Sequence, residues 1–182
     1  MPKAAPPSAV CSRRYTAARD SGMRGTKPVL WIVLHCTEST SAESTAKYFA
    51  NEHATGSAHL VVDNGACFRC LRDDQIPWAA PGANTNGFHI EQAGFAHWSE
   101  AEWMRHSATL ERAAWKAAAA CWRFNVPPVF RAAPQLRARV RGVTTHWECT
   151  RSFGGTHHDP GAGWPRQFFM NLVRSFYDEQ QV

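Results

Sequence analysis

Val29-Leu-Trp-Ile-Val-Leu-His35 is a continuous apolar run, rich in β-branched residues, that ends in a histidine. An unbroken run of this kind is typical of a strand that is covered on both faces of its sheet. We therefore predict a buried central strand at residues 29–35. Such a strand requires other strands beside it and helices packed on the sheet.

The segments around this run predict those neighbours. Alternating or apolar patterns predict four further strands, at residues 57–63, 66–71, 87–93 and 142–146. Three helices are predicted at residues 41–52, 99–124 and 165–178, and long loops at residues 73–86 and 147–164. This order predicts the fold class α/β: a single domain with a mixed central β-sheet of about five or six strands flanked by helices.

Local signals mark several of the boundaries. Asp63-Asn64-Gly65 is a turn sequence that would join two strands in a hairpin. Ser99-Glu-Ala-Glu102 is a capping box that would open the long helix, and Val126-Pro-Pro128 would end it. Residues 1–26 are rich in Pro, Ser, Arg and Ala without periodicity, so we expect an irregular N-terminal arm, with the globular domain at 27–182.

The composition is that of a one-domain globular protein. The chain has 182 residues, of which 44% are hydrophobic and 19% charged, which is enough for a core without disulfide bonds. No apolar run approaches the ~20 residues needed to span a bilayer. The N-terminal residues lack the apolar centre of a secretory signal, so we expect a chain made in the cytoplasm without a membrane span.

The charge has a mild basic bias, with a net charge of +5. It favours an anionic partner without identifying one. An acid-free stretch at residues 126–147 contains four arginines, namely Arg131, Arg137, Arg139 and Arg141. A solvated loop and a binding patch are both consistent with it. Nucleic acid is not the expected partner, because no recognised nucleic-acid motif and no basic helix accompany the arginines.

Six cysteines occur, and two of them, Cys67 and Cys70, form a CxxC pair. A structural zinc site would need a second pair, and a redox pair would sit at the start of a helix rather than in a predicted strand. We expect Cys67 and Cys70 to be structural and most of the other cysteines to be reduced packing residues.

Three short segments carry the residues best suited to chemistry. His35 ends the central strand, His146 ends the strand predicted at 142–146, and Asp159 lies in the Gly-rich segment His157-His-Asp-Pro-Gly161. Strand ends can aim side chains into a shared cleft. Two imidazoles and a carboxylate are suitable zinc ligands, and three protein ligands leave a fourth position for water, as catalytic sites require.

Several motifs in order resemble the zinc-dependent N-acetylmuramoyl-L-alanine amidase family, which includes phage endolysins, bacterial muropeptide amidases and peptidoglycan recognition proteins. The resemblance covers roughly residues 28–175. The segments that carry it are Val33-Leu-His35-Cys-Thr37, Ser57-Ala-His59-Leu, Val62-Asp-Asn-Gly65, Ile76-Pro-Trp78-Ala-Ala, Asn86-Gly-Phe-His-Ile-Glu91, and Thr145-His146 through Asp159-Pro160-Gly161.

The resemblance implies roles for these residues. His35, His146 and Asp159 would hold one Zn²⁺ per chain. Glu91 would take a proton from the attacking water, and His157, where many relatives carry lysine, would donate to the oxyanion. Imidazole titrates near neutral pH, so this replacement predicts pH-sensitive activity. The implied reaction hydrolyses the amide bond between N-acetylmuramic acid and L-alanine, which makes residues 27–182 a zinc amidase catalytic domain.

Substrate contacts are expected from Trp78, Asn86 and Trp164, with the two tryptophans stacking from loops beside the cleft. The chain also departs from the family pattern. Ala79 stands where bacterial relatives often have histidine, and Gly87-Phe88-His89 replaces the usual Ser-Ile-Gly. That places His89 near the site, although we expect its side chain to point away.

The expected partner is bacterial peptidoglycan or a muropeptide, and the expected state is a monomer. A phage endolysin, released to the cell wall after synthesis, is the favoured interpretation. A cytoplasmic muropeptide-recycling amidase and a non-catalytic peptidoglycan-binding module are the alternatives. A cysteine peptidase that pairs Cys36 with His35 is disfavoured, because adjacent strand residues point to opposite faces.

Overall fold

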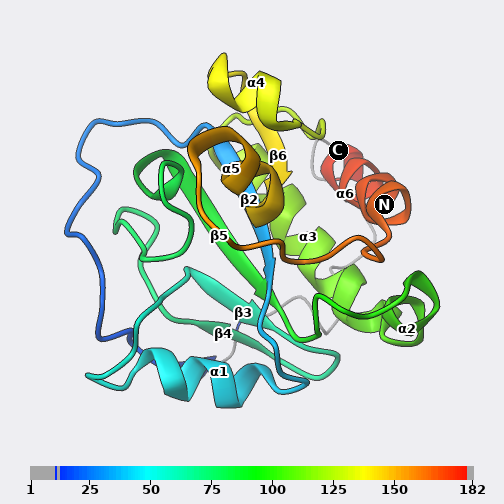
Figure 1. The fold of residues 1–182 in the computed structure, drawn as a ribbon, viewed down its shortest axis with the longest axis horizontal. Helices are drawn as coiled ribbons and strands as arrows, with labels where there is room; N and C mark the ends of the chain where they lie inside the picture. The colour runs from blue at the N-terminus through cyan, green and yellow to red at the C-terminus, as the bar shows by residue number, and fades with distance from the viewer. Residues whose placement is uncertain (1–10, 12, 180–182) are drawn as a thin grey trace.

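A six-stranded mixed sheet forms the centre of the computed structural model, which describes residue 11 and residues 13–179 (Figure 1). The strand order is β1-β4-β3-β5-β2-β6. The strands are β1 Arg13–Arg14, β2 Trp31–Cys36, β3 Leu60–Val62, β4 Cys67–Arg69, β5 Gly87–Gln92 and β6 Gly142–Thr145. The hairpin partners β3 and β4 are antiparallel and the other neighbours are parallel. This confirms the predicted α/β class, and the apolar run forms an interior strand, β2, which is paired on both sides and lies next to the edge strand β6.

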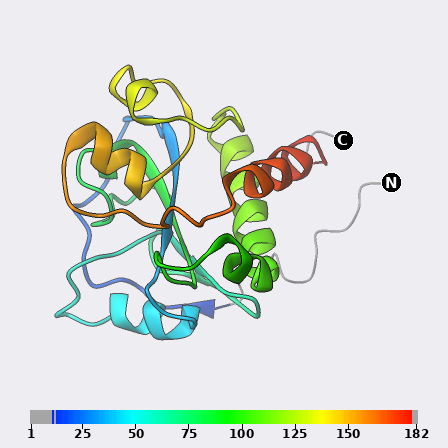
Figure 2. The same ribbon diagram turned by 45° about the vertical axis from the view of Figure 1, so that its right-hand side comes forward.

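Helices pack on both faces of this sheet. They are α1 Ala42–Phe49, α2 Glu100–Arg105, α3 Ser107–Arg123, α4 Ala133–Arg137, α5 His146–Phe153 and α6 Arg166–Glu179, with a 3₁₀ turn η2 at Asn84–Asn86. Figure 2 shows α3 and α6 together on one side of the sheet, with α1 and α5 on the other.

The two faces of β2 are covered differently. Ile32 and Leu34 point into the main core beneath α3 and α6. Trp31 and Val33 point the other way, into a smaller cluster with residues of α4 and α5, while α1 covers Val61 and Phe68 farther along the same face. The second face is therefore covered at its two sides by different helices, and His35, which shares the parity of Trp31 and Val33, lies between them.

Most predicted elements are confirmed, and the predicted capping box at Ser99 is present. One expectation is wrong: residues 147–164 are not all loop, because α5 begins at His146. The Thr145 side chain accepts a hydrogen bond from the Glu148 amide and caps this helix. The predicted long helix is also divided at His106 into α2 and α3.

The predicted N-terminal arm is largely irregular in its described part, yet it packs closely on the domain. Strand β1 pairs with β4, and Ala17 is buried. Arg24 is 6% exposed and donates hydrogen bonds to the backbone carbonyls of residues 73, 75, 85 and 87. A disulfide joins Cys11 to Cys67. These contacts tie the arm to the sheet edge and to the segment before β5.

Cys36, Cys121 and Cys149 are free and buried, as predicted for packing residues, and Cys70 of the CxxC pair is also free and buried. Within residues 13–179, none of the helices combines the length and apolar composition needed to cross a membrane.

Candidate metal centre and cavity

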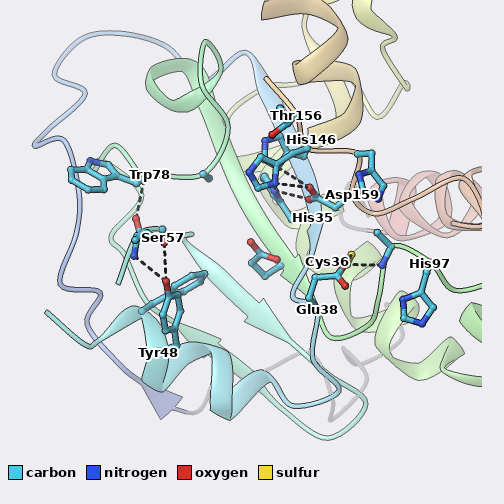
Figure 3. Close-up of a pocket in the computed structure, with 18 residues that line it drawn as sticks. His35, Cys36, Glu38, Tyr48, Ser57, Trp78, His97, His146, Thr156 and Asp159 are labelled. Carbon is cyan, nitrogen blue, oxygen red and sulfur yellow. Dashed lines mark hydrogen bonds and ion pairs between the residues drawn. The ribbon is translucent and has the colours of Figure 1, made fainter. Parts of the chain in front are cut away.

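The three predicted metal ligands lie together at one edge of the sheet (Figure 3). His35 is near the end of β2, and His146 directly follows β6 as the first residue of α5. Strands β2 and β6 are parallel neighbours, so their carboxyl ends meet at the same edge. Asp159 reaches the two histidines from the loop after α5, which brings together residues that are up to 124 positions apart in sequence.

The spacing of the donor atoms fits a small tetrahedral metal ion. His35 Nδ1 lies 3.2 Å from Asp159 Oδ2 and 3.1 Å from His146 Nδ1, and His146 Nδ1 lies 3.0 Å from Asp159 Oδ1. Zinc bonds of about 2.0 Å in tetrahedral geometry place ligand atoms about 3.3 Å apart. The three residues are at most 8% exposed. They could hold a zinc ion with little rearrangement.

The protonation states also suit a metal. Burial lowers the pKa of His35, which favours the neutral imidazole that metals bind. Burial raises the pKa of Asp159, but hydrogen bonds with His146 and His35 outweigh it and leave that pKa below its ordinary value. The set is therefore one ionised carboxylate with imidazole donors.

The loop that carries Asp159 is held in place by backbone contacts. The Trp147 amide donates to the Asp159 carbonyl at 2.9 Å, which links the loop to the first turn of α5. Gly161 has a φ of 92°, and a Cβ at this position would lie 1.9 Å from the Ala96 carbonyl oxygen. The Asp-Pro-Gly sequence thus needs its glycine for both conformation and space.

Glu91 lies beside the ligands on the same face of the sheet, because β5 places it in register with His35 of β2. Its Oε2 atom is buried and has no hydrogen-bond partner among the described residues. Burial raises its pKa well above the ordinary value, and the nearby carboxylates of Asp159 and Glu38 raise it further. A carboxyl group with one buried, unpartnered oxygen and a raised proton affinity, beside a candidate metal set, is suited to act as a general base.

A cavity of about 600 Å³ opens in front of these groups. Its far wall contains Tyr48, Ser57 and Trp78, which Figure 3 shows across from the metal ligands. Trp78 is 42% exposed. His157 lies at the rim, where its ring stacks on His146 at 4.5 Å and its Nδ1 is 3.6 Å from Asp159 Oδ1. Its predicted position beside the metal site is therefore observed, while its role as a donor stays a prediction.

A family model described as N-acetylmuramoyl-L-alanine amidase matches residues 25–162, well over half of the chain. The chain belongs to this amidase family. The match includes His35, Glu91, His146 and Asp159, so the residues that converge in space all lie within the family segment. Comparison of the sequence with curated proteins gives no match.

Solved structures share the amidase fold. Hydrolase AmiA of Staphylococcus aureus, in complex with its ligand, has a TM-score of 0.73 and 17% identity over 93% of this chain and 84% of that chain. A derivative of AmpD has a TM-score of 0.65 and 17% identity over 90% of this chain and 95% of that chain. A mutant endolysin from Bacillus subtilis has a TM-score of 0.57 and 20% identity over 92% of this chain and 96% of that chain. At these identities the likeness extends to the fold alone.

Two predicted substrate residues lie away from this amidase cavity. Asn86 precedes β5 at the end opposite Glu91, and its amide donates to the Pro28 carbonyl at 2.7 Å. Trp164 is 7% exposed, packs on Phe169 and donates from Nε1 to Gln92 Oε1. Trp164 lines a separate pocket and not this cavity, so the structure does not place its ring beside the metal ligands, where we expected it to stack on substrate. Trp78 is the predicted aromatic residue that does line the cavity.

His89, in contrast, lies closer to the site than expected. Instead of pointing away from the amidase site, its Nδ1 lies 2.9 Å from His35 Nε2. His89 and Glu91 are two residues apart on one strand and therefore share a face, which was the available signal. Tyr48 and Thr55 also line the cavity without having been predicted. They lie at the end of α1 and in the loop that follows it, which the sequence pattern alone did not connect to the site.

The cysteine peptidase alternative has no support in this geometry. Burial raises the pKa of Cys36, and the carboxylates of Asp159, Glu91 and Glu38 raise it further, so the thiol stays protonated. Its Sγ donates to Glu38 Oε1 at 3.4 Å rather than to a histidine. A protonated thiol is not a nucleophile.

Proposed function

We propose that this chain is a zinc-dependent amidase that hydrolyses the bond between N-acetylmuramic acid and L-alanine in peptidoglycan. One observation carries the proposal: the buried set of His35, His146 and Asp159 opens on the same cavity as Glu91, within the segment that matches the amidase family. A binding module would need the cavity but would have no use for a carboxyl group whose buried Oε2 has no hydrogen-bond partner among the described residues.

The residues divide the reaction between them. His35, His146 and Asp159 would hold the zinc ion, which when bound lowers the pKa of water from 15.7 to about 7 and polarises a carbonyl. Glu91 takes the proton from the attacking water and returns it to the leaving amine. His157, at the rim beside His146, donates a hydrogen bond where negative charge develops on the scissile carbonyl oxygen.

The wall opposite the metal ligands suits a glycopeptide. Trp78 exposes part of its ring while its Nε1 donates to Ser21 Oγ at 2.8 Å, which fixes the ring plane. Tyr48 is 47% exposed and its hydroxyl is held by Thr55 at 2.9 Å. Two anchored aromatic faces beside a polar cavity favour stacking with a sugar ring or with the lactyl-peptide junction.

We further propose that the substrate is the intact cell wall and that the chain acts as a phage endolysin. An endolysin from Bacillus subtilis is among the proteins that share its fold, as are AmpD and AmiA. The recycling alternative differs in substrate size rather than in chemistry. Comparing hydrolysis rates on intact sacculi and on soluble muropeptides separates the two, and a marked preference for soluble muropeptides would favour recycling.

The decisive experiment for the reaction uses purified sacculi and the full chain. The expected products are new L-alanine amino termini, with no new reducing sugar ends. A zinc chelator should abolish the release and added Zn²⁺ should restore it. Release that continues in excess chelator would reject the zinc mechanism, and binding to sacculi without release would indicate a recognition module.

A further inference from the structure

His89 occupies a position directly behind a metal ligand. It lies on β5, is 0% exposed, and its ring centroid is 5.2 Å from that of His35. Its Nδ1 is 2.9 Å from His35 Nε2, on the side of the His35 ring that faces away from Asp159 and His146. The two rings are close enough for a single hydrogen bond.

The direction of that bond follows from the metal set. His35 faces Asp159 and His146 through Nδ1, so Nδ1 is the atom that would bind zinc. A neutral imidazole that binds a metal through one nitrogen carries its proton on the other. His35 must then hold its proton on Nε2 and donate it to His89 Nδ1.

We infer that His89 is a positioning residue for the zinc ligand His35, because its Nδ1 accepts the His35 Nε2–H bond and thereby fixes the tautomer and the orientation of that ring. The inference rests on the proposed function. Metal-binding histidines commonly donate their second N–H to an acceptor, and loss of that acceptor weakens metal binding. Here the acceptor is another histidine rather than a carboxylate or a carbonyl.

The strand is shaped to receive this ring. Gly87 lies two residues earlier on the same face, and a Cβ added there would be 2.3 Å from His89 Nε2. The φ of Gly87 is −104°, which any residue can adopt. The glycine is therefore required for space rather than for backbone conformation, and part of that space is filled by the His89 ring.

A third histidine fixes the backbone beneath His89. The His89 amide donates to His59 Nδ1 at 3.0 Å, and the two rings are stacked with centroids 6.0 Å apart. His59 Nε2 lies 3.2 Å from the Gln75 carbonyl, to which it donates. Burial and the Arg24 charge lower the pKa of His59 to about 3, so this support stays neutral.

The other ring nitrogen of His89, Nε2, also indicates that this position carries a histidine because of its contact with His35. Nε2 is buried and has no hydrogen-bond partner in the part of the chain that the structure describes. A buried N–H without an acceptor is unfavourable, and an apolar side chain would avoid it. Fold stability alone therefore does not account for a histidine here, whereas the contact between Nδ1 and His35 does.

Two substitutions with the same branched side-chain shape test this role. Asn places Oδ1 close to the position of His Nδ1 and retains an acceptor, whereas Leu has the same number of side-chain heavy atoms and no acceptor. We expect His89→Asn to bind Zn²⁺ nearly as tightly as the wild type and His89→Leu to bind it about 10- to 100-fold more weakly. The dissociation constants are measured on the full chain by competition with a chromophoric chelator, and circular dichroism of the metal-free proteins verifies that both variants fold.

The ratio between the two variants decides the outcome. If Leu weakens zinc binding at least tenfold relative to Asn, the positioning role is supported; a smaller ratio overturns it. A wild-type chain that binds no zinc would instead reject the proposed metal centre, and this inference with it. The two failures are distinguishable because only the second appears in the wild type.

A measurement on the unsubstituted protein guards against misfolded variants. In the zinc-loaded chain with ¹⁵N-labelled histidine, ring spectra report which nitrogen is protonated. We expect a proton on Nε2 of both His35 and His89, with His89 Nδ1 acting as a hydrogen-bond acceptor. A proton on His89 Nδ1 would overturn the inference.

Discussion

The chemistry of Glu91 depends on its surroundings rather than on its residue type. In the part of the chain that the structure describes, its buried Oε2 has no hydrogen-bond partner, and burial raises its pKa well above the ordinary value. A carboxyl group in this state takes up protons readily, which suits proton transfer from water to an amine. The same environment favours the neutral form of this carboxyl group more than water does.

Replacing Glu91 by Gln tests the base directly. Gln keeps the size of the side chain and resembles the protonated carboxyl group, so the fold and the metal ligands should be unaffected. We expect Glu91→Gln to lose about 10²- to 10⁴-fold in kcat on sacculi while binding one zinc ion per chain. A variant that retains most of its activity would show that another group takes the proton.

Single residues also show which parts of the site were predictable. His35 and His146 stand at the ends of apolar strand patterns, and parallel neighbouring strands bring such positions to one edge. The burial of Trp164 is not predictable from the sequence, because a loop position near Asp159 gives no information on it. In the structure Trp164 packs on Phe169 and is largely buried. The contact between His89 and His35 depends on the register of β5 against β2, which no local pattern specifies.

Among the elements, helix α5 is the one that the sequence pattern did not predict, although local signals for it are present. Thr145-His-Trp-Glu148 has the spacing of a helix start, and Gly154, with a φ of 91°, follows its last turn. The strand pattern that leads into His146 outweighed these signals. Glu148 Oε2 also accepts from the Ala133 amide at 2.8 Å, so α5 is stabilised by a tertiary contact that sequence alone does not reveal.

Helix α3 carries a charge that its environment does not favour. Lys116 is half-buried, and none of the ion pairs found in residues 13–179 involves it. Burial, together with the positive charges of Arg69 and Arg112, lowers its pKa to about 8. Because the pKa in the folded state is below that of the unfolded chain, the charged form costs stability below pH 8, and the cost disappears as the pH rises toward 10.5.

We therefore expect Lys116→Met to raise the free energy of unfolding by about 1 kcal/mol at pH 7, a figure reduced for the partial exposure of the ammonium group. The gain should shrink between pH 8 and pH 10. Urea unfolding at pH 7 and at pH 10 measures the gain, and Lys27→Met, at an exposed lysine, is the control. An equal gain at both pH values would attribute the effect to packing rather than to charge.

At the scale of the whole molecule, the site exists because the two faces of the sheet are covered unequally. Helices α3 and α6 cover one face continuously. On the other face α1 packs at one side and α5 at the other, and the cavity with Glu91 opens between them. The sequence predicts the number and type of most elements, but the strand order, and therefore this gap, depends on pairings between distant segments.

The arginine-rich stretch lies around α4, near the end of β5 that is opposite Glu91, where Arg139 donates to Asn86 Oδ1, and only part of it is available to a partner. Arg131 and Arg141 are half-buried and donate to backbone carbonyls. Arg137 and Arg139 are exposed, and each also makes one surface hydrogen bond, to the Arg151 carbonyl and to Asn86 Oδ1. The structure thus divides the predicted patch into two arginines that hold the fold and two that face solvent. Exposed charges of this kind act at long range and are screened by salt, with a Debye length of about 10 Å at 0.1 M.

If the exposed pair draws the enzyme to anionic cell walls, Arg137→Gln combined with Arg139→Gln should slow hydrolysis of intact walls severalfold at low salt. The difference from the wild type should vanish near 1 M salt, where the Debye length falls to about 3 Å. Hydrolysis of a small soluble muropeptide should be unchanged, because it depends on the cavity alone. Arg105→Gln with Arg174→Gln removes the same charge from the exposed surfaces of α2 and α6 and serves as the control. Equal slowing by both pairs would assign the effect to net charge rather than to the surface around α4.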